Sequence, residues 1–328
     1  MNRVVALGAA LACALALSAC EHETPGPAVE QAVGLDVDAP RVTLVSAGDG
    51  DKRVLAYSDI GQSQEVTVAV TEGFAQDVVK AEAVDGFRSS TMDETTTTLP
   101  LSAEVSVASA ATEGQVEATR NAFFTAGVPQ YSSGTDISSG EGFQFGWRAD
   151  DSGQVSSLRL AAPQGATDEA RAAVEQAILH LVSLPVVFPT DAVGHGASWT
   201  VDSRVTGDDT LLQTATYTVT KIDGDTVELD VDVQQRPSLG ALSLDQAGAA
   251  GATAAAATAA TASDAAAGET LDVQSATSTT NGSLTVDLGR PLPTAGSVDI
   301  DTVVVYGQKD SAVRVVQTTE TGLRFSPS

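Results

Sequence analysis

Cysteine is nearly absent from this chain of 328 residues, and its two cysteines, Cys13 and Cys20, both lie near the N-terminus. No cysteine follows Cys20. The main body of the chain therefore has no disulfide framework and no metal site built from thiolates. Its stability must come from an apolar core.

Aromatic and basic residues are also scarce. Aromatics make up 4% of the sequence, and 17 Lys and Arg face 43 Asp and Glu, which gives a formal net charge of −26. Nucleic-acid binding requires a basic surface, so this charge argues against it. The acidic surface is also expected to be repelled by anionic lipids, while it keeps an exported protein soluble.

The first twenty residues, MNRVVALGAALACALALSAC, have the layout of a secretory signal. Arg3 precedes an uncharged run from Val4 to Leu17. About fourteen helical residues span roughly 21 Å, which is less than the ~30 Å of a bilayer core. The segment therefore predicts export rather than a membrane-spanning helix.

The end of this signal, Leu17-Ser18-Ala19-Cys20, resembles the lipobox of bacterial lipoproteins. The resemblance implies that residues 1–19 are removed and that Cys20 carries a diacylglyceryl group with fatty acyl chains such as palmitate. The protein would then be held at the extracytoplasmic face of the cell membrane by this anchor. The alternative is an ordinary signal peptide that happens to contain a cysteine.

Residues 20–40 are acidic, contain Pro25, Pro27 and Pro40, and lack a hydrophobic period. This composition predicts a disordered tether. About twenty flexible residues span roughly 25 Å, several times the Debye length of ~8 Å at physiological salt. The tether is expected to keep the acidic body clear of the lipid headgroups.

From residue 41 onward, apolar and polar residues alternate, which is typical of strands with one buried face. Asp223-Gly224 and Asn281-Gly282 are predicted hairpin turns between such strands. The segment 111–127 is ambiguous, and we interpret it as a short helix followed by a loop. The strands predicted before residue 162 are 41–47, 52–59, 64–72, 77–84, 87–93, 99–108, 141–149 and 154–161.

One helix is expected over residues 167–184, TDEARAAVEQAILHLVSL. Thr167 can cap it, acidic residues follow in the first turn, and Pro185 marks its end. Its apolar stripe must pack on a sheet face. The predicted fold is a single mainly β domain over residues 41–328. It is an antiparallel curved sheet or half-barrel, with one or two helices packed on it and a possible duplication of one meander.

The region 236–269 interrupts the strand pattern. Its centre, residues 248–268, is rich in Ala, Thr and Gly and has no large side chain that could fill a core. We interpret the region as a flexible insertion in a hairpin.

Residues with catalytic chemistry are few. Of the three histidines, only His195, in the loop Val193-Gly194-His195-Gly196, is a candidate, and a turn residue is the simpler interpretation. No nucleophile elbow, zinc-protease or phosphate-loop motif occurs. Carboxylate pairs such as Asp230 and Asp232 fit the solvated face of a strand. The sequence predicts no enzyme, no metal site and no cofactor.

The order of lipobox, tether, meander, helix and second meander resembles a family of uncharacterised actinobacterial lipoproteins that has no assigned activity. A looser resemblance links it to half-barrel lipoproteins that carry lipids, and this implies a helix enclosing an apolar cavity on the concave face. The residues that carry the family resemblance are Leu184-Pro185, Pro189, Val193 to Trp199, Tyr217 and Asp223-Gly224-Asp225.

Two functions follow as hypotheses. The first is a non-enzymatic lipoprotein that binds a hydrophobic or lipid ligand between helix and sheet. The second is a structural or protein-interaction lipoprotein of the cell envelope with a solid core. In both cases the protein is expected to attach to the membrane through the lipid on Cys20 and not to bind nucleic acid. The sequence does not identify a protein partner. The lining residues expected for the first function, which would be core residues in the second, are Phe143, Phe145, Val174, Ile178, Leu181 and Trp199.

Deletion of residues 248–268 should leave the melting temperature within a few degrees of the parent. The reason is that loop-closure entropy grows slowly with length and the segment has little apolar surface to bury. Thermal unfolding monitored by circular dichroism measures this, and a larger drop would mean that the segment packs on the domain.

Overall fold

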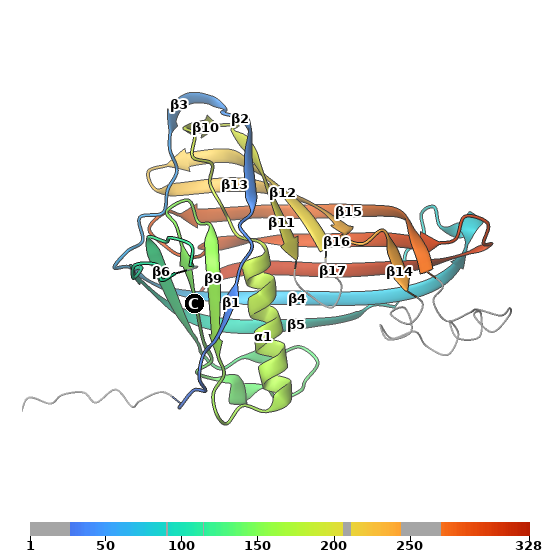
Figure 1. Cartoon of the computed structure of the whole chain (residues 1–328), viewed down its shortest axis with the longest axis horizontal. Coiled ribbons are helices and arrows are strands. Elements are labelled where there is room, and N and C mark those ends of the chain that lie inside the picture. Colours follow the sequence, from blue (N-terminus) through green and yellow to red (C-terminus); the bar gives the residue numbers. More distant parts are fainter. Residues whose placement is uncertain (1–26, 90, 114, 206–210, 244–269) are drawn as a thin grey trace, which may run out of the picture.

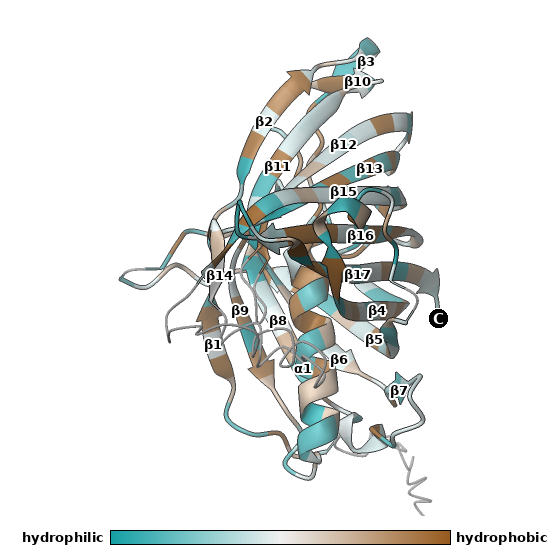
Figure 2. Cartoon of the chain, turned by 90° about the vertical axis from the view of Figure 1, so that its right-hand side faces the viewer, coloured by the Kyte–Doolittle hydropathy of each residue, from teal (hydrophilic) through white to brown (hydrophobic). Residues whose placement is uncertain are grey.

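In the described part of the chain, one large antiparallel sheet curves around a single α-helix (Figures 1 and 2). The computed structural model describes residues 27–89, 91–113, 115–205, 211–243 and 270–328. Within them the sheet is not closed into a barrel. The predicted fold class, a mainly β curved sheet with a helix, is confirmed.

The chain before the helix forms nine strands and two 3₁₀ turns, η1 (Ala81–Ala83) and η2 (Ser138–Gly140). The strands are β1 (Val33–Asp36), β2 (Arg41–Ser46), β3 (Asp49–Arg53), β4 (Ser63–Lys80), β5 (Asp93–Val107), β6 (Arg120–Ala126), β7 (Gln130–Tyr131), β8 (Gln144–Ala149) and β9 (Val155–Ala161).

After the helix α1 (Asp168–Ser183), the described chain forms eight further strands. They are β10 (Val193–His195), β11 (Ser198–Val205), β12 (Leu211–Asp223), β13 (Thr226–Pro237), β14 (Ala241–Ser243), β15 (Thr270–Asp287), β16 (Ala295–Gly307) and β17 (Val313–Pro327).

The strand order is β1-β9-β8-β6-β5-β4-β17-β16-β15-β13-β12-β11-β2. Apart from the edge strands β1 and β2, each half is an antiparallel meander, and the two halves meet where β4 pairs with β17. The predicted internal duplication stays a prediction. β1 and β2 are consecutive in sequence yet form the two opposite edges of the sheet. Residues 37–40 therefore cross between the edges, and we call the gap between β1–β9 and β11–β2 the seam.

The helix α1 begins as the sequence predicts. Thr167 Oγ1 accepts a hydrogen bond of 3.2 Å from the backbone N–H of Ala170, and acidic side chains occupy the first turn. The helix lies across the long strands on the concave face (Figure 1). Sixteen residues span about 24 Å, the width of about five strands. Its buried residues are Ala170, Val174, Ala177, Ile178 and Leu181.

The strands are longer than the helix can cover. The 18 residues of β4 extend for about 60 Å, while a helix lying across them is about 10 Å wide. Beyond the helix, buried polar residues lie on the concave face of five adjacent strands, β12, β13, β15, β16 and β17. We call the following set the polar belt: Gln213, Gln235, Ser278, Thr302 and Gln317.

Hydrogen bonds connect most of the polar belt. Gln235 Nε2 donates to Gln213 Oε1 at 2.9 Å, and Thr302 Oγ1 donates to Gln235 Oε1 at 3.0 Å. Gln213 Nε2 in turn donates to the carbonyl oxygen of Ser183 at the end of α1, at 3.1 Å. Because these buried polar groups are paired with one another, they cost little free energy in the concave face.

The backbone ladder between β13 and β15 ends at Asp230 and Ser283. Beyond it, the Thr280 hydroxyl accepts a bond of 3.0 Å from the N–H of Val233 and donates one of 2.8 Å to its carbonyl oxygen. The Ser278 hydroxyl accepts from the N–H of Gln235 in the same way, at 2.9 Å. Two side chains thus take the place of ladder bonds where the strands separate.

The predicted turn at Asn281-Gly282 does not exist. Both residues lie inside the continuous strand β15, where Asn281 pairs with Asp299. A Cβ on Gly282 would lie 2.8 Å from the carbonyl oxygen of Val231. The glycine therefore allows a close approach of β13 instead of a turn.

The predicted tether, residues 20–40, also differs from the structure, because residues 27–40 lie on the domain and include β1. The expected helix in 111–127 is replaced by β6, and the expected strands 64–72 and 77–84 form one strand, β4. Residues 87–89, 91 and 92 of the expected strand 87–93 form no strand. The predicted insertion 236–269 contains the end of β13 and β14, and residues 244–269 lie outside the described residues.

Replacing Thr280 with Val should lower the free energy of unfolding by about 1–3 kcal/mol, because both backbone groups of Val233 lose their partner. Urea unfolding measures the change. Thr216→Val, on β12 and on the opposite face of the sheet, is the matched control and should stay within about 0.5 kcal/mol of the parent. Equal effects of the two variants would contradict the bridging role of Thr280.

Candidate functional site

The six residues predicted to line a ligand site all lie in the main apolar core. Phe143, Val174, Ile178 and Trp199 are 0% exposed, and the other two are hardly more accessible. Trp199 Nε1 donates a hydrogen bond of 2.8 Å to the carbonyl oxygen of Val187. The structure thus brings the predicted residues together as packed neighbours, and their role in binding stays a prediction.

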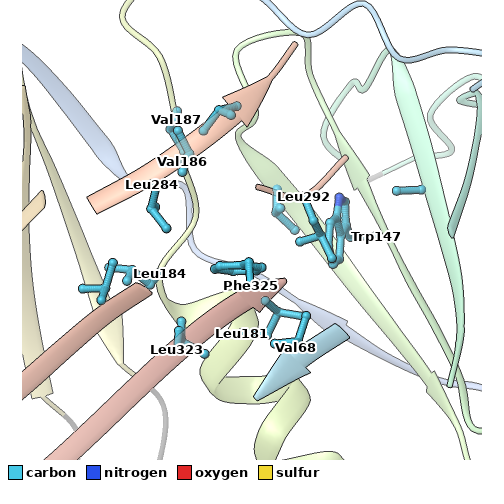
Figure 3. Close-up of a cluster of buried hydrophobic side chains, with 14 of the residues drawn as sticks. Val68, Trp147, Leu181, Leu184, Val186, Val187, Leu284, Leu292, Leu323 and Phe325 are labelled. Carbon is cyan, nitrogen blue, oxygen red and sulfur yellow. The ribbon is translucent and has the colours of Figure 1, made fainter. Parts of the chain in front are cut away.

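The space under α1 is nearly filled. Figure 3 shows Leu181 of the helix among side chains of the sheet that include Val68 and Phe325. The cavity at this place has a volume of about 50 Å³ and is bordered by Leu181 and Trp147. Ligand sites for small molecules usually measure about 300–1,000 Å³. This cavity, at the C-terminal end of α1, is too small for a lipid chain.

A larger apolar space lies at the seam. This groove has a volume of about 290 Å³ and runs between α1 and the two edges of the sheet. We call it the seam groove. Five of its thirteen lining residues are polar or charged, and its apolar lining consists of Leu35, Val37, Pro40, Val155, Leu158, Leu179, Val182 and Pro185.

One wall of the seam groove is the N-terminal segment that the sequence predicts to be a tether. Val29 forms a β-bridge with Pro163, and β1 pairs with β9. The Glu30 carboxylate accepts hydrogen bonds of 2.9 and 2.5 Å from the two terminal nitrogens of Arg171 on α1. These bonds lower the pKa of Glu30. The wall is therefore fixed both to the sheet and to the helix.

A polar basin of about 760 Å³ adjoins the seam groove, and the two share Asp38, Ser203 and Arg204 as lining residues. In the basin, Arg41 pairs with Asp202 at 3.0 Å. A hydrogen bond from Thr214, followed by the effect of Arg41, lowers the pKa of Asp202 although partial burial opposes this. The seam groove thus changes from apolar to polar along its length.

A buried ion pair supports the end of the sheet near the seam. Asp59, 0% exposed, accepts hydrogen bonds of 2.9 and 2.5 Å from Arg120. The Arg120 guanidinium carbon also lies 4.3 Å from the ring centroid of Tyr57. Burial raises the pKa of Asp59, and the charge and hydrogen bonds of Arg120 oppose that rise. Both charges are satisfied within the pair, so we assign it a structural role.

A second titratable contact joins α1 to β4. His180 Nε2 contacts the Glu72 carboxylate and lies 3.0 Å from Gln176 Nε2. Burial alone would raise the pKa of Glu72, but the hydrogen bonds and charge of His180, together with Gln176, outweigh it and lower the pKa. This contact holds the helix against the sheet.

The candidate catalytic histidine, His195, is exposed on β10 opposite Asp49. Among the described residues, no group of three or more His, Cys, Asp and Glu is placed to hold a metal ion. No helix of the described chain has the length and apolar character that crossing a membrane requires. Cys20, the predicted lipidation site, lies outside the described residues.

Sequence reasoning missed the seam groove. Leu35 and Val37 stand in a segment whose acidic, proline-containing composition indicates a tether, and nothing in it shows that β1 pairs with a strand more than a hundred residues later. Leu179 and Val182 flank the predicted apolar stripe of α1, and this is the one signal that could have suggested a second apolar contact.

No protein-family model matches the sequence, and no curated protein matches it either. The resemblance to actinobacterial lipoproteins therefore stays a prediction.

Replacing Glu72 with Gln should lower the free energy of unfolding at pH 7 by about 1 kcal/mol. A carboxyl whose pKa is lower in the folded state stabilises the protein above its ordinary pKa of 4.5, and this contribution is lost as the pH falls through the folded pKa. The parent should therefore lose stability below about pH 4.5 more steeply than the variant.

Chemical unfolding between pH 3 and pH 7 measures this difference. Glu104→Gln, at an exposed position on β5, is the control and should change stability by less than about 0.5 kcal/mol. Parallel pH profiles for the parent and Glu72→Gln would contradict the stabilising role of the contact.

Proposed function

We propose that this protein is a non-enzymatic lipoprotein, anchored through Cys20 at the extracytoplasmic face of the cell membrane, that binds a hydrophobic ligand between α1 and the sheet. The ligand occupies the seam groove. The lipobox-like sequence Leu17-Ser18-Ala19-Cys20 supports the anchor. The observation that carries the binding function is the apolar groove of about 290 Å³ at the one place where the sheet is open.

The shape of the groove favours ligand binding. Its walls come from α1, from β9 and from the segment that leads from β1 to β2, so a ligand would contact three separate parts of the chain. Leu179 and Val182 are only partly buried, although they pack against the main core. Covering such side chains with an apolar ligand is favourable because it removes their surface from water.

A second function is a structural or protein-interaction lipoprotein of the cell envelope. The solid packing under α1 supports it, because the cavity there measures only about 50 Å³. This function needs no ligand, and it predicts a protein neighbour in crosslinking experiments on intact envelopes.

Native mass spectrometry of the full chain, extracted with mild detergent, tests ligand binding. We expect a bound amphiphile to be recovered with the parent. Val182→Trp fills the groove with a large side chain and should reduce the bound fraction at least about tenfold, because an apolar site without free volume cannot accept a chain.

Ala172→Trp is the matched control, since it adds the same side chain at an exposed position of the same helix. It should retain the ligand. Repeated recovery of the parent without any amphiphile would contradict the binding function and favour the structural one.

A further inference from the structure

We infer that the ligand of the seam groove is a single-chain anionic amphiphile, a long-chain carboxylate, whose head group lies at the junction formed by Ser203 and Arg204. This inference rests on the proposed function and specifies its ligand. Two features of the junction carry it: its position and its charge.

The position of the junction matches the layout of an amphiphile. The pairing of β11 with β2 ends where Asp202 pairs with Arg41. Ser203 and Arg204 follow on β11, beyond this last pair. Both residues line the apolar groove and also the polar basin. An acyl chain in the groove would therefore place its head group beside these two residues.

The lining of the basin carries more basic than acidic residues, although the whole chain is strongly acidic. Three arginines and two aspartates line it, whereas the whole chain carries a net charge of −26. Arg41 is occupied by Asp202 at 3.0 Å. Arg204 lies 3.9 Å from Asp38, whose side chain is 88% exposed, so water screens this contact strongly.

The remaining arginine, Arg236, faces no carboxylate within ion-pair distance in the described part of the chain. The register joins Arg204 to Leu212 and Leu212 to Arg236, which places both arginines on the same face of three adjacent strands. Two guanidinium groups are therefore available for an anion. The groove is lined by Asp36 and Asp38 with one arginine, Arg204, whereas three arginines face two aspartates in the basin.

Ser203 carries a polar group without a partner. Its hydroxyl oxygen is buried and makes no hydrogen bond among the described residues. Ser203 and Arg204 are consecutive on β11 and point to opposite faces of the sheet, so we assign this hydroxyl no role in binding the anion. The volume of the groove, about 290 Å³, lies at the lower end of ligand sites and fits one chain better than two.

The test uses the full chain, extracted and exchanged into an amphipol, with a neutral fluorescent probe, N-phenyl-1-naphthylamine, bound in the groove. Palmitate, 1-hexadecanol and hexadecyltrimethylammonium have the same chain length and compete for the probe. Palmitate should compete at least about threefold better than the alcohol, and the cation should compete worst, because only the anion gains the contact with Arg204.

Arg204→Gln should reduce the palmitate affinity about three- to fivefold and leave the alcohol within twofold. Arg204→Lys keeps the charge and should retain most of the preference. Arg324→Gln, at an exposed position on β17, is the matched control and should change nothing. A melting curve for each variant reports folding, and the comparison of the three ligands on the parent does not depend on any variant.

Equal affinity for palmitate and the alcohol would overturn the assignment of the head group while the groove keeps its binding function. The same conclusion follows if Arg204→Gln weakens both ligands equally. Failure of all three amphiphiles and of the probe to bind would overturn the proposed function as well, so the two failures are distinguishable.

Discussion

The structure depends on one constraint: a single helix must cover the apolar concave face of a sheet that is much larger than the helix. Helix α1 lies across the strands and covers about 10 Å of strands that extend up to about 60 Å. Beneath it the inward side chains are aliphatic or aromatic and form one core. Next to the helix they change to Gln, Ser and Thr, most of which the polar belt pairs with one another. Farther along the strands a second, smaller apolar cluster forms around Val304 and Tyr306. The width of the helix thus sets the line at which the composition of the strands changes.

The seam is the second consequence of this layout. Because β1 and β2 are consecutive in the chain but form opposite edges, the sheet comes near to closing upon itself and residues 37–40 cross the remaining gap. The gap leaves an apolar groove beside α1, whereas the helix fills the space directly beneath it. A ligand site at the seam and a solid core under the helix are therefore compatible. Binding in the groove would need no movement of the core, because its walls already stand apart.

The buried ion pair of Asp59 and Arg120 has a different role from the charged residues at the seam. Asp59 and Arg120 neutralise each other inside the core and hold the segment that leads from β3 into β4, so they are unsuited to bind a ligand. At the seam, by contrast, Arg204 is exposed, and water screens its contact with Asp38. Groups that are not already satisfied are the ones that can gain from a ligand, and the structure places them at the end of an apolar groove.

The sequence by itself determined the composition of the core, the strand-rich fold class and helix α1 with its Thr167 cap, because these depend on local periodicity and on local hydrogen bonds. It misjudged Asn281-Gly282, since an Asn-Gly pair favours a turn locally while the close approach of Val231 requires a glycine inside a strand. Only the tertiary structure decided that residues 33–36 pair with β9 and that Leu35 and Val182 line a common groove. Those contacts join residues more than a hundred positions apart, and no local pattern in the chain encodes them.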